Sequence, residues 1–305
     1  MITETDLKLI AALDENGRAS YAELSRSLGI SISTISKKVK SLLDDRVIEI
    51  QAIPNPNRLG QTAHALVALR TSVDKLENVC KRLEVYPSID LLAAVFGRFN
   101  LVASVQFSNW DDLHDFISTK IGAVDDITNM EVFFAKENKK RFYHILGTRD
   151  HEKSVLKIDD IDRKIINALC VNGRSSVSDL AKMFDLSISS VSKRLSHLFE
   201  ENAIRVQAHV DYNKIGYHAR AFILIRTKNN MIENICRTIN NFTEVQTVIT
   251  LINGYDIFLG TVSYDSESLY QLVNHKIAVI PGVLNAEVWI RGKNFKRYFG
   301  PLPEK

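Results

Sequence analysis

The chain has no run of about 18 consecutive apolar residues, the length that a helix needs to cross a bilayer. Its first residues, Met-Ile-Thr-Glu-Thr-Asp, are polar and acidic, so no signal peptide is expected. Cysteine is scarce: Cys80, Cys170 and Cys236 form an odd set without a Cys-x-x-Cys pair. These absences exclude a disulfide scaffold and predict a cytoplasmic protein with three reduced, buried thiols.

Metal-binding patterns and strong charge are also missing. The 8 histidines are scattered without metal-ligand spacing, so neither a metal site nor a cofactor is expected. The formal net charge is only +3, from 39 basic and 36 acidic residues. If the partner is a polyanion, small basic surfaces must bind it, because the field of the whole chain is weak.

The chain contains one long internal repeat. With an offset of 156 residues and no gap, Asn16-Gly17-Arg18 recurs as Asn172-Gly173-Arg174, and Ser31-Ile32-Ser33 recurs as Ser187-Ile188-Ser189. Solenoid repeats have periods of roughly 20–50 residues, so this is a different kind of duplication. A whole functional unit occurs twice, and its function must suit a built-in pair.

Each copy begins with three short predicted helices. In copy one they cover residues 6–15, start after Ser20, and run from Ser31 to about residue 43. Asn16-Gly17-Arg18 is a helix stop with a glycine at the turn. Gly29 supplies a positive φ between the second and third helices, where copy two has Asp185. The apolar stripe of the third helix (Ile35, Val39, Leu42) completes the pattern of a helix-turn-helix.

The polar face of the third helix is the candidate DNA-reading surface. Hydroxyl groups at its start can reach base edges or phosphates, and its cations neutralise phosphates. DNA contacts are predicted from Ser31, Ser33, Thr34, Lys37, Lys38 and Lys40 in copy one, and from Ser187, Ser189, Ser190, Lys193 and Arg194 in copy two. Ile32 and Ile188 either touch thymine methyl groups or pack against the module, and packing is the favoured interpretation.

The second part of each copy alternates strands and helices after an extended segment at 47–53. Predicted strands are 63–71, 89–96, 99–107 and 127–135, with helices at 74–85 and 109–121; copy two has strands at 219–227, 244–251, 255–263 and 283–290, with helices at 231–241 and 266–278. This β-α-β-β-α-β order indicates a ferredoxin-like sandwich. Basic clusters follow each sandwich and are interpreted as solvated tails, with phosphate contact as the alternative: Lys136, Lys139, Lys140 and Arg141, then Arg291, Lys293, Lys296 and Arg297.

The predicted fold class is therefore α+β, with two copies of a winged helix-turn-helix domain followed by a ferredoxin-like domain. The helix-turn-helix domains cover residues 1–60 and 162–216, and the ferredoxin-like effector and oligomerisation domains cover 61–148 and 217–305. Residues 149–161 are charged and without a clear period, which is typical of a linker.

Four segments carry a resemblance to a known family: the Leu-Gly or Ile-Gly pairs at 59–60 and 215–216, the turn at 97–101, the turn at 254–257, and Pro281-Gly282-Val283. With them the chain resembles the Lrp/AsnC family of prokaryotic transcription regulators, twice and over nearly its whole length. The resemblance implies dimerisation through the sandwich and binding of small effectors, usually amino acids, at subunit interfaces near the Gly-x-Tyr-Asp turn.

The candidate effector residues are Gly97, Phe99 and Asn100 in copy one and Gly254, Tyr255 and Asp256 in copy two. Copy one departs from the family pattern because Asn100 replaces the aspartate and no Pro-Gly-Val turn follows. Any effector response is therefore expected to depend more on copy two. A plain connecting turn is the alternative at both places.

The predicted function is sequence-specific binding of double-stranded DNA by a transcription regulator with two reading helices per chain. The chain is expected to be a non-enzyme that self-associates, as a pseudo-dimer within the chain and as a homo-oligomer. One alternative is an architectural DNA-binding protein without strong sequence preference. The other is an enzyme, because siroheme decarboxylases resemble this two-domain plan. Their Asn-Tyr-x-Arg-x-His motif corresponds here to residues 92–98, which contain no histidine.

Overall fold

The computed structural model describes residues 2–141, 144–145, 155–228 and 230–296. The chain divides into two compact units, and each takes one segment from each copy of the repeat. The helical unit comprises residues 1–60 and 154–216, and the sheet unit comprises 61–153 and 217–298. Homologous segments of the two copies therefore fold together.

The helical unit contains two groups of three helices. The first has α1 (Glu4–Glu15), α2 (Tyr21–Leu28) and α3 (Ile32–Asp44), followed by β1 (Ile48–Pro54); the second has α7 (Asp160–Val171), α8 (Val177–Met183) and α9 (Ile188–Glu200), followed by β7 (Ile204–Val210) and the short helix η3 (Tyr212–Ile215). Both second helices begin with a capping box, at Ser20 and Ser176. The predicted left-handed turn is confirmed, with φ of 67° at Gly29 and 52° at Asp185.

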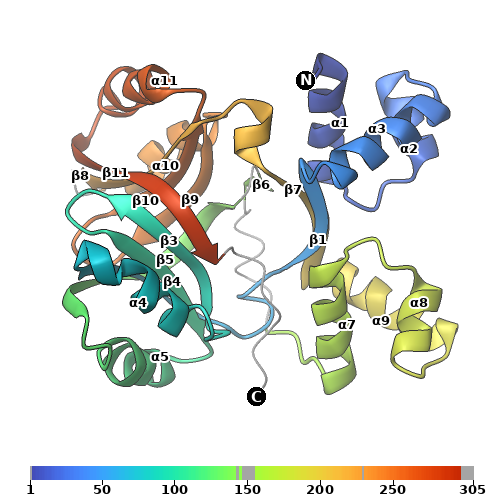
Figure 1. Ribbon diagram of the computed structural model, residues 1–305, viewed down its shortest axis with the longest axis horizontal. Helices are drawn as coiled ribbons and strands as arrows, with labels where there is room; N and C mark the ends of the chain where they lie inside the picture. The colour runs from blue at the N-terminus through green and yellow to red at the C-terminus, as the bar shows by residue number, and fades with distance from the viewer. Residues whose placement is uncertain (1, 142–143, 146–154, 229, 297–305) are drawn as a thin grey trace. The chain divides into compact units, whose positions relative to one another are not determined.

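Strands β1 and β7 pair with each other and join the two helix groups (Figure 1). They are antiparallel, and Gln51 lies opposite Gln207, its own counterpart in the repeat. That register places a local pseudo-twofold axis between the two glutamines. A single cluster of buried apolar residues draws on all six helices and both strands. The two helix-turn-helix modules thus share one core and form one folding body.

The repeated Asn-Gly-Arg turn is part of this junction. Gly17 does not adopt the left-handed conformation that is typical of a helix-ending glycine. Its N–H instead donates to the Val206 carbonyl at 2.8 Å, and a Cβ added there would lie 2.9 Å from the Gln207 Cα. Gly173 meets the other strand in the same way, because its N–H donates to the Ile50 carbonyl at 2.8 Å. Glycine is required here because each turn closely approaches the other copy's strand.

Arginine follows each of these glycines and reaches into the opposite copy. The Arg18 guanidinium donates to the carbonyls of Gly173 at 2.7 Å and Ser175 at 3.1 Å. Arg174 reciprocates with the carbonyls of Gly17 at 2.8 Å and Ala19 at 2.9 Å. These four hydrogen bonds join the turn after α1 to the turn after α7.

The sheet unit contains the strands and helices of both sandwiches. Copy one contributes β2 (Ala63–Thr71), η1 (Val73–Lys75), α4 (Leu76–Leu83), β3 (Ile89–Phe96), β4 (Leu101–Phe107), α5 (Trp110–Phe116), η2 (Ile117–Ile121), β5 (Ile127–Arg141) and β6 (His144–Ile145). Copy two contributes β8 (Ala219–Thr227), α10 (Ile232–Asn240), β9 (Val245–Leu251), β10 (Ile257–Ser263), α11 (Ser266–Gln271), η4 (Leu272–Ile277) and β11 (Val283–Lys296).

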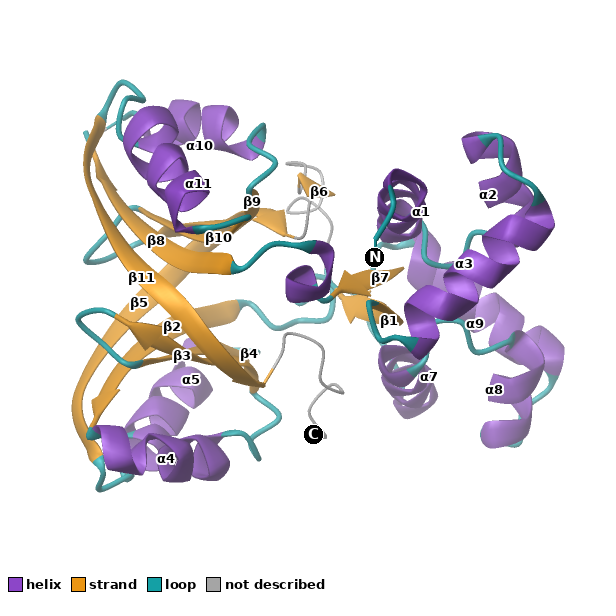
Figure 2. Cartoon of the chain, turned by 45° about the horizontal axis from the view of Figure 1, so that its top comes forward, coloured by secondary structure: helices purple, strands orange, loops and turns teal. Residues whose placement is uncertain are grey.

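The strands close on themselves. Within each copy the order is β5-β2-β4-β3 or β11-β8-β10-β9, and the copies join through β3–β11 and β9–β5. Without the two-residue β6, this makes a closed ring of eight strands among the described residues. Figure 2 shows α4 and α5 on one side of the ring and α10 and α11 on the other.

Both faces of the ring are apolar, which explains the nearly unbroken hydrophobic strands. In β2, for example, Ala65, Val67 and Leu69 pack under α4 and α5, whereas Leu66 and Ala68 point into the ring. The interior cluster contains six aromatic side chains, from both copies: Phe99, Phe133, Phe222, Tyr255, Phe258 and Trp289. The ring core is therefore shared between the copies, whereas each helical layer has its own.

Two predicted strands are longer in the structure than the sequence pattern indicates. The first halves of β5 and β11 pair within their own copy, and their second halves cross to β9 and β3 of the other copy. The basic clusters lie in these second halves, so they belong to strands of the sheet and are not tails; Lys136 and Lys293 are exposed, whereas Lys140 is buried. Arg297 lies outside the described residues, and the side chain of Arg141 is not described.

Two equivalent lysines in these strands close the ends of helices. Lys140 is 3% exposed and donates to the Asn240 and Phe242 carbonyls at 2.9 and 3.1 Å, at the end of α10. Lys296 donates to the Tyr86 carbonyl at 2.6 Å, after α4. Burial lowers the pKa of both ammonium groups. They hold the other copy's helices and are not oriented for phosphate contact.

The three cysteines are free and buried, as predicted. Burial raises the pKa of each thiol to about 12. None of the helices in the described ranges combines the length and apolar character that crossing a bilayer requires.

We expect Arg18→Ala to lower the free energy of unfolding of the helical unit by about 1–3 kcal/mol, because carbonyls at the junction lose charged donors. Arg26→Ala is the matched control, since Arg26 is exposed on α2 and its removal is expected to change stability by less than about 0.5 kcal/mol. Urea unfolding of both variants measures the difference. Equal stabilities would show that the crossed arginines do not hold the copies together.

Candidate DNA-contacting face and effector pocket

Most of the predicted DNA contacts lie at the start of each third helix, and Lys40 lies further along α3. Ser31, Ser33, Thr34, Lys37 and Lys40 are exposed on α3, as are Ser187, Ser189 and Lys193 on α9, and Ser190 is half-buried. Ser31 and Ser187 also cap their helices, each accepting a backbone N–H at 3.2 Å. The buried stripe of Ile35, Val39 and Leu42 is confirmed, so the opposite face points away from the core.

The first residue of each helix is also exposed. Ile32 is 52% exposed and Ile188 is 61% exposed. The favoured interpretation, that these side chains pack against their module, is therefore wrong. The module core is already filled by the stripe one turn further on.

Lys38 and Arg194, by contrast, are turned back toward the first helix of their own copy. Lys38 Nζ lies 2.8 Å from Asp6 Oδ1 and 3.3 Å from Thr3 Oγ1, the two members of the α1 capping box. Arg194 Nη1 lies 2.7 Å from both Asp159 and Asp162, the capping box of α7. Both cations connect the third helix to the first helix through ion pairs. In this they differ from Lys37 and Lys193, which are exposed.

These ion pairs shift the acids that they contact. Burial alone would raise the pKa of Asp6, but hydrogen bonds from Lys38 and Thr3 outweigh it and the pKa is lowered. The Arg194 guanidinium donates hydrogen bonds to the carboxylates of Asp162 and Asp159, and these bonds raise its pKa. The charged forms are thus the stable ones in both copies.

The far end of each third helix is held by the other copy, a feature that the sequence did not reveal. Arg58 is 2% exposed, and its Nε donates to the Glu201 carbonyl at 2.8 Å just after α9. Its Nη2 also lies 2.6 Å from the Glu201 carboxylate. At the equivalent position, Lys214 donates to the Asp45 carbonyl at 2.6 Å just after α3. A cation at a helix C-terminus complements the helix dipole.

In the sheet unit, the turn glycines lie against aromatic side chains of the opposite copy. A Cβ on Gly97 would lie 2.7 Å from Trp289 Cδ1, and one on Gly254 would lie 2.9 Å from Phe133 Cε1. Phe133 and Trp289 are equivalent positions of the repeat. The glycines therefore allow the copies to approach closely, and Gly254 additionally has a φ of 73°.

Asn100 and Asp256 fasten the end of a strand in both copies. Asn100 Oδ1 accepts the Thr71 N–H at 3.0 Å, and its Nδ2 donates to the Thr71 carbonyl at 2.6 Å. Asp256 Oδ2 accepts the Thr227 N–H at 2.6 Å. The equivalent backbone N–H therefore donates to an amide oxygen in copy one and to a carboxyl oxygen in copy two.

The two aromatic residues of the predicted effector turns belong to the ring core. Phe99 is 1% exposed and packs edge-to-face on Trp289 at 5.6 Å between ring centroids. Tyr255 is 8% exposed and donates its hydroxyl to Glu287. Burial and this carboxylate together raise the pKa of Tyr255 to about 12. Neither ring is placed to enclose a ligand.

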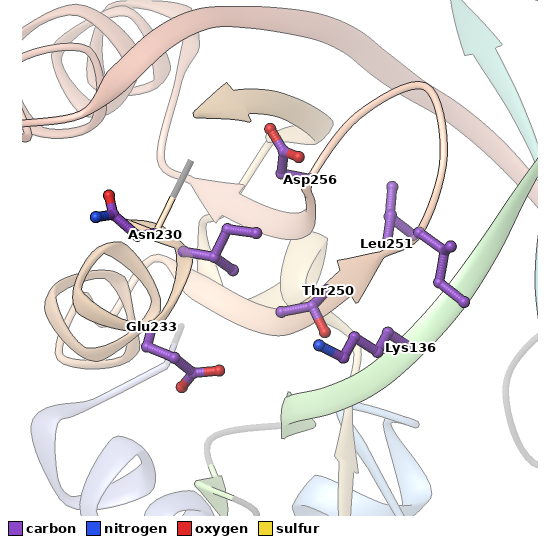
Figure 3. Close-up of a pocket in the computed structure, with 8 residues that line it drawn as sticks. Lys136, Asn230, Glu233, Thr250, Leu251 and Asp256 are labelled. Atoms are coloured by element: carbon purple, nitrogen blue, oxygen red, sulfur yellow. The ribbon is translucent and has the colours of Figure 1, made fainter. Parts of the chain in front are cut away.

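A cavity of about 580 Å³ opens beside Asp256. Figure 3 shows Asp256, Glu233 and Lys136 around it, with Lys136 coming from β5 of copy one. The complete lining is Lys136, Asn230, Ile232, Glu233, Thr250, Leu251, Ile252 and Asp256. Of the six predicted effector residues, Asp256 lines this cavity. Both copies contribute to it, and it combines acidic, basic and apolar groups.

Comparison with protein families decides the assignment. A model of the Lrp/AsnC ligand binding domain matches residues 63–145 and 220–300, together more than half of the 305 residues. The chain belongs to the Lrp/AsnC family. Its helical unit agrees, because a winged helix-turn-helix DNA-binding model matches residues 2–49 and an AsnC-type helix-turn-helix model matches 158–198. The resemblance predicted from the sequence is confirmed, and the chain is an Lrp/AsnC-type transcription regulator.

Individual relatives of this Lrp/AsnC regulator are about half its length. An uncharacterised HTH-type transcriptional regulator of Pyrococcus furiosus is 28% identical over 144 residues, 47% of this chain and 97% of the relative. The HTH-type transcriptional regulator LrpA of Pyrococcus horikoshii is 30% identical over 131 residues, 43% of this chain and 93% of LrpA. Each relative therefore corresponds to one copy.

A solved structure matches nearly the whole chain. It is the siroheme decarboxylase NirDL, with a TM-score of 0.70 and 16% identity over 98% of this chain and 94% of NirDL. At this identity the likeness shows a shared fold.

We expect Lys38→Met to destabilise the protein by about 1 kcal/mol near neutral pH, because Asp6 loses its charged donor. The lowered pKa of Asp6 contributes stability above its unfolded pKa of about 4, and this contribution is lost as pH falls through the folded value. The gap between wild type and variant should therefore close below about pH 4. Melting temperatures from pH 3 to 8 test this, with Lys37→Met as the control that leaves stability unchanged. A gap independent of pH would contradict the ion-pair role.

Proposed function

We propose that this chain is a cytoplasmic, sequence-specific regulator that binds one DNA duplex with both of its third helices. The shared core of the helical unit carries this proposal. Because α3 and α9 belong to one folding body related by a pseudo-twofold axis, the chain presents two reading helices without assembling a dimer. The exposed hydroxyls and the ammonium groups of Lys37, Lys40 and Lys193 are the groups that contact DNA.

The domain organisation follows from the same duplication. We propose two helix-turn-helix domains and two ferredoxin-like domains with the boundaries 1–60, 61–148, 162–216 and 217–305. The strand order within each copy and the helices on one face support the ferredoxin-like assignment. The copies act as a pseudo-dimer, and further self-association into homo-oligomers uses the outer surfaces of the sandwiches.

The cavity beside Asp256 is the proposed effector site, with an amino acid as its ligand. Its volume lies within the range of small-molecule pockets. The carboxylates of Asp256 and Glu233 suit an ammonium group, Lys136 suits a carboxylate, and Ile232, Leu251 and Ile252 suit an apolar side chain. Asn100 cannot supply the charge in copy one, which supports an asymmetric response.

The competing functions make different predictions. An architectural protein would bind DNA with strong salt dependence and no sequence preference. A siroheme-decarboxylase-like activity has only the likeness of fold in its favour, and residues 92–98 lack the histidine expected of that motif. We therefore propose no enzymatic activity.

Replacing Lys37 or Lys193 with alanine is expected to weaken binding to a selected operator roughly 5–10-fold and to reduce the salt slope by about one, since each removes a phosphate contact. Lys81→Ala is the matched control, because Lys81 is an exposed cation on α4 of the sheet unit. Binding isotherms at several salt concentrations give both quantities. An unchanged salt slope would show that the helix in question does not touch the duplex.

A thermal-shift screen of the twenty amino acids tests the effector site, because a ligand that binds the native state raises the melting temperature. Asp256→Asn should abolish the shift while preserving stability, because Asn100 already accepts the equivalent backbone N–H in copy one. Lys136→Ala should weaken the shift as well. A shift that survives Asp256→Asn would move the site elsewhere, and no shift with any amino acid would leave the sandwich as an assembly module.

A further inference from the structure

The first residue of both third helices is an exposed isoleucine, and its side chain is not part of the buried core. Ile32 and Ile188 are 52% and 61% exposed, although large aliphatic side chains usually gain from burial. Each follows the capping serine of its helix and is followed within two turns by an exposed lysine. The same unburied apolar group thus occurs at one place in each copy.

Other exposed apolar residues of the helical unit are not repeated in this way. Val171 is 79% exposed, but its counterpart in copy one is Glu15. Met183 is 61% exposed, and its counterpart is Ser27. Isolated exposed apolar side chains are ordinary and need no function. The two isoleucines differ because the same exposed residue stands at the same position of both copies, whereas Val171 and Met183 have no apolar counterpart.

We propose that Ile32 and Ile188 recognise the 5-methyl group of thymine at equivalent positions of two half-sites, an inference that rests on the proposed function. In the major groove, the thymine methyl is the apolar group that a base pair offers to a protein. Residues at the start of a recognition helix are the ones that reach base edges. Lys37 and Lys193 hold the helices on the phosphates, whose charge they complement.

The pseudo-twofold axis gives this contact a defined pattern. Gln51 lies opposite its counterpart Gln207, and the proposal extends this pseudo-twofold relation of the strands to the two isoleucines. The recognised thymines are therefore expected to lie on opposite strands, at symmetric distances from the operator centre. The rest of each half-site can differ, since Lys40 in copy one corresponds to Ser196 in copy two.

The experiment selects an operator with the full chain from random duplexes and then replaces each thymine with uracil, which lacks only the methyl group. We expect a symmetric pair of thymines whose replacement weakens binding roughly fourfold each, the effect of about one buried methyl group. In Ile32→Ala the penalty should vanish at one half-site and persist at the other, and in Ile188→Ala the reverse. Val171→Ala is the matched control and should keep both penalties.

The outcomes separate this inference from the function on which it rests. If selection enriches an operator but no thymine shows a penalty, or if both penalties persist in both isoleucine variants, thymine recognition by these residues is overturned and DNA recognition stands. If no sequence is enriched over random duplexes, the proposed sequence-specific function fails first. Melting temperatures equal to wild type establish that the exposed isoleucines have been replaced without loss of the fold.

Discussion

The pairing of β1 with β7 is the contact on which the helical unit depends. A three-helix module of this size has little core of its own, and small domains bury too small a fraction of their surface to be robust. The β1–β7 pair packs against both modules and contributes Ile50, Ala52, Val206 and Ala208 to their shared core. Because each glycine turn rests directly on the other copy's strand, the modules cannot separate without losing this core.

Much of this arrangement could be predicted from the sequence, because periodicity reports local burial. The stripe of Ile35, Val39 and Leu42, the capping boxes and most strand positions follow from patterns that involve only neighbouring residues. What the sequence could not reveal depends on distant partners. No residue close to Lys38 in the sequence indicates its ion pair with Asp6. No residue close to Lys140 indicates its hydrogen bonds to carbonyls at the end of α10. A lysine that binds phosphate and a lysine that caps a helix look the same in a sequence, so charge alone misplaced the basic clusters.

The predicted effector turns are a second case in which the sequence pattern did not reveal contacts between distant residues. Phe99 and Tyr255 match a family pattern that suggests ligand contact, yet both rings are buried in the ring core. The duplication itself explains why the turns are so distinctive: each must pass close to an aromatic side chain of the other copy. Asp256 differs because it lines a cavity and also accepts the Thr227 N–H at the end of β8. One carboxylate can therefore serve both the fold and a ligand.

Because the strands close into a ring within one chain, folding of the sheet unit does not depend on protein concentration. A single sandwich would expose two unpaired strand edges, and such edges invite pairing with other chains. Here β3 meets β11 and β5 meets β9 inside one molecule, so the described strands cover each other's edges. A dimer of separate chains dissociates on dilution, and its stability depends on protomer concentration. A chain that carries its own partner is free of that dependence, so a few molecules per cell fold as completely as a concentrated solution.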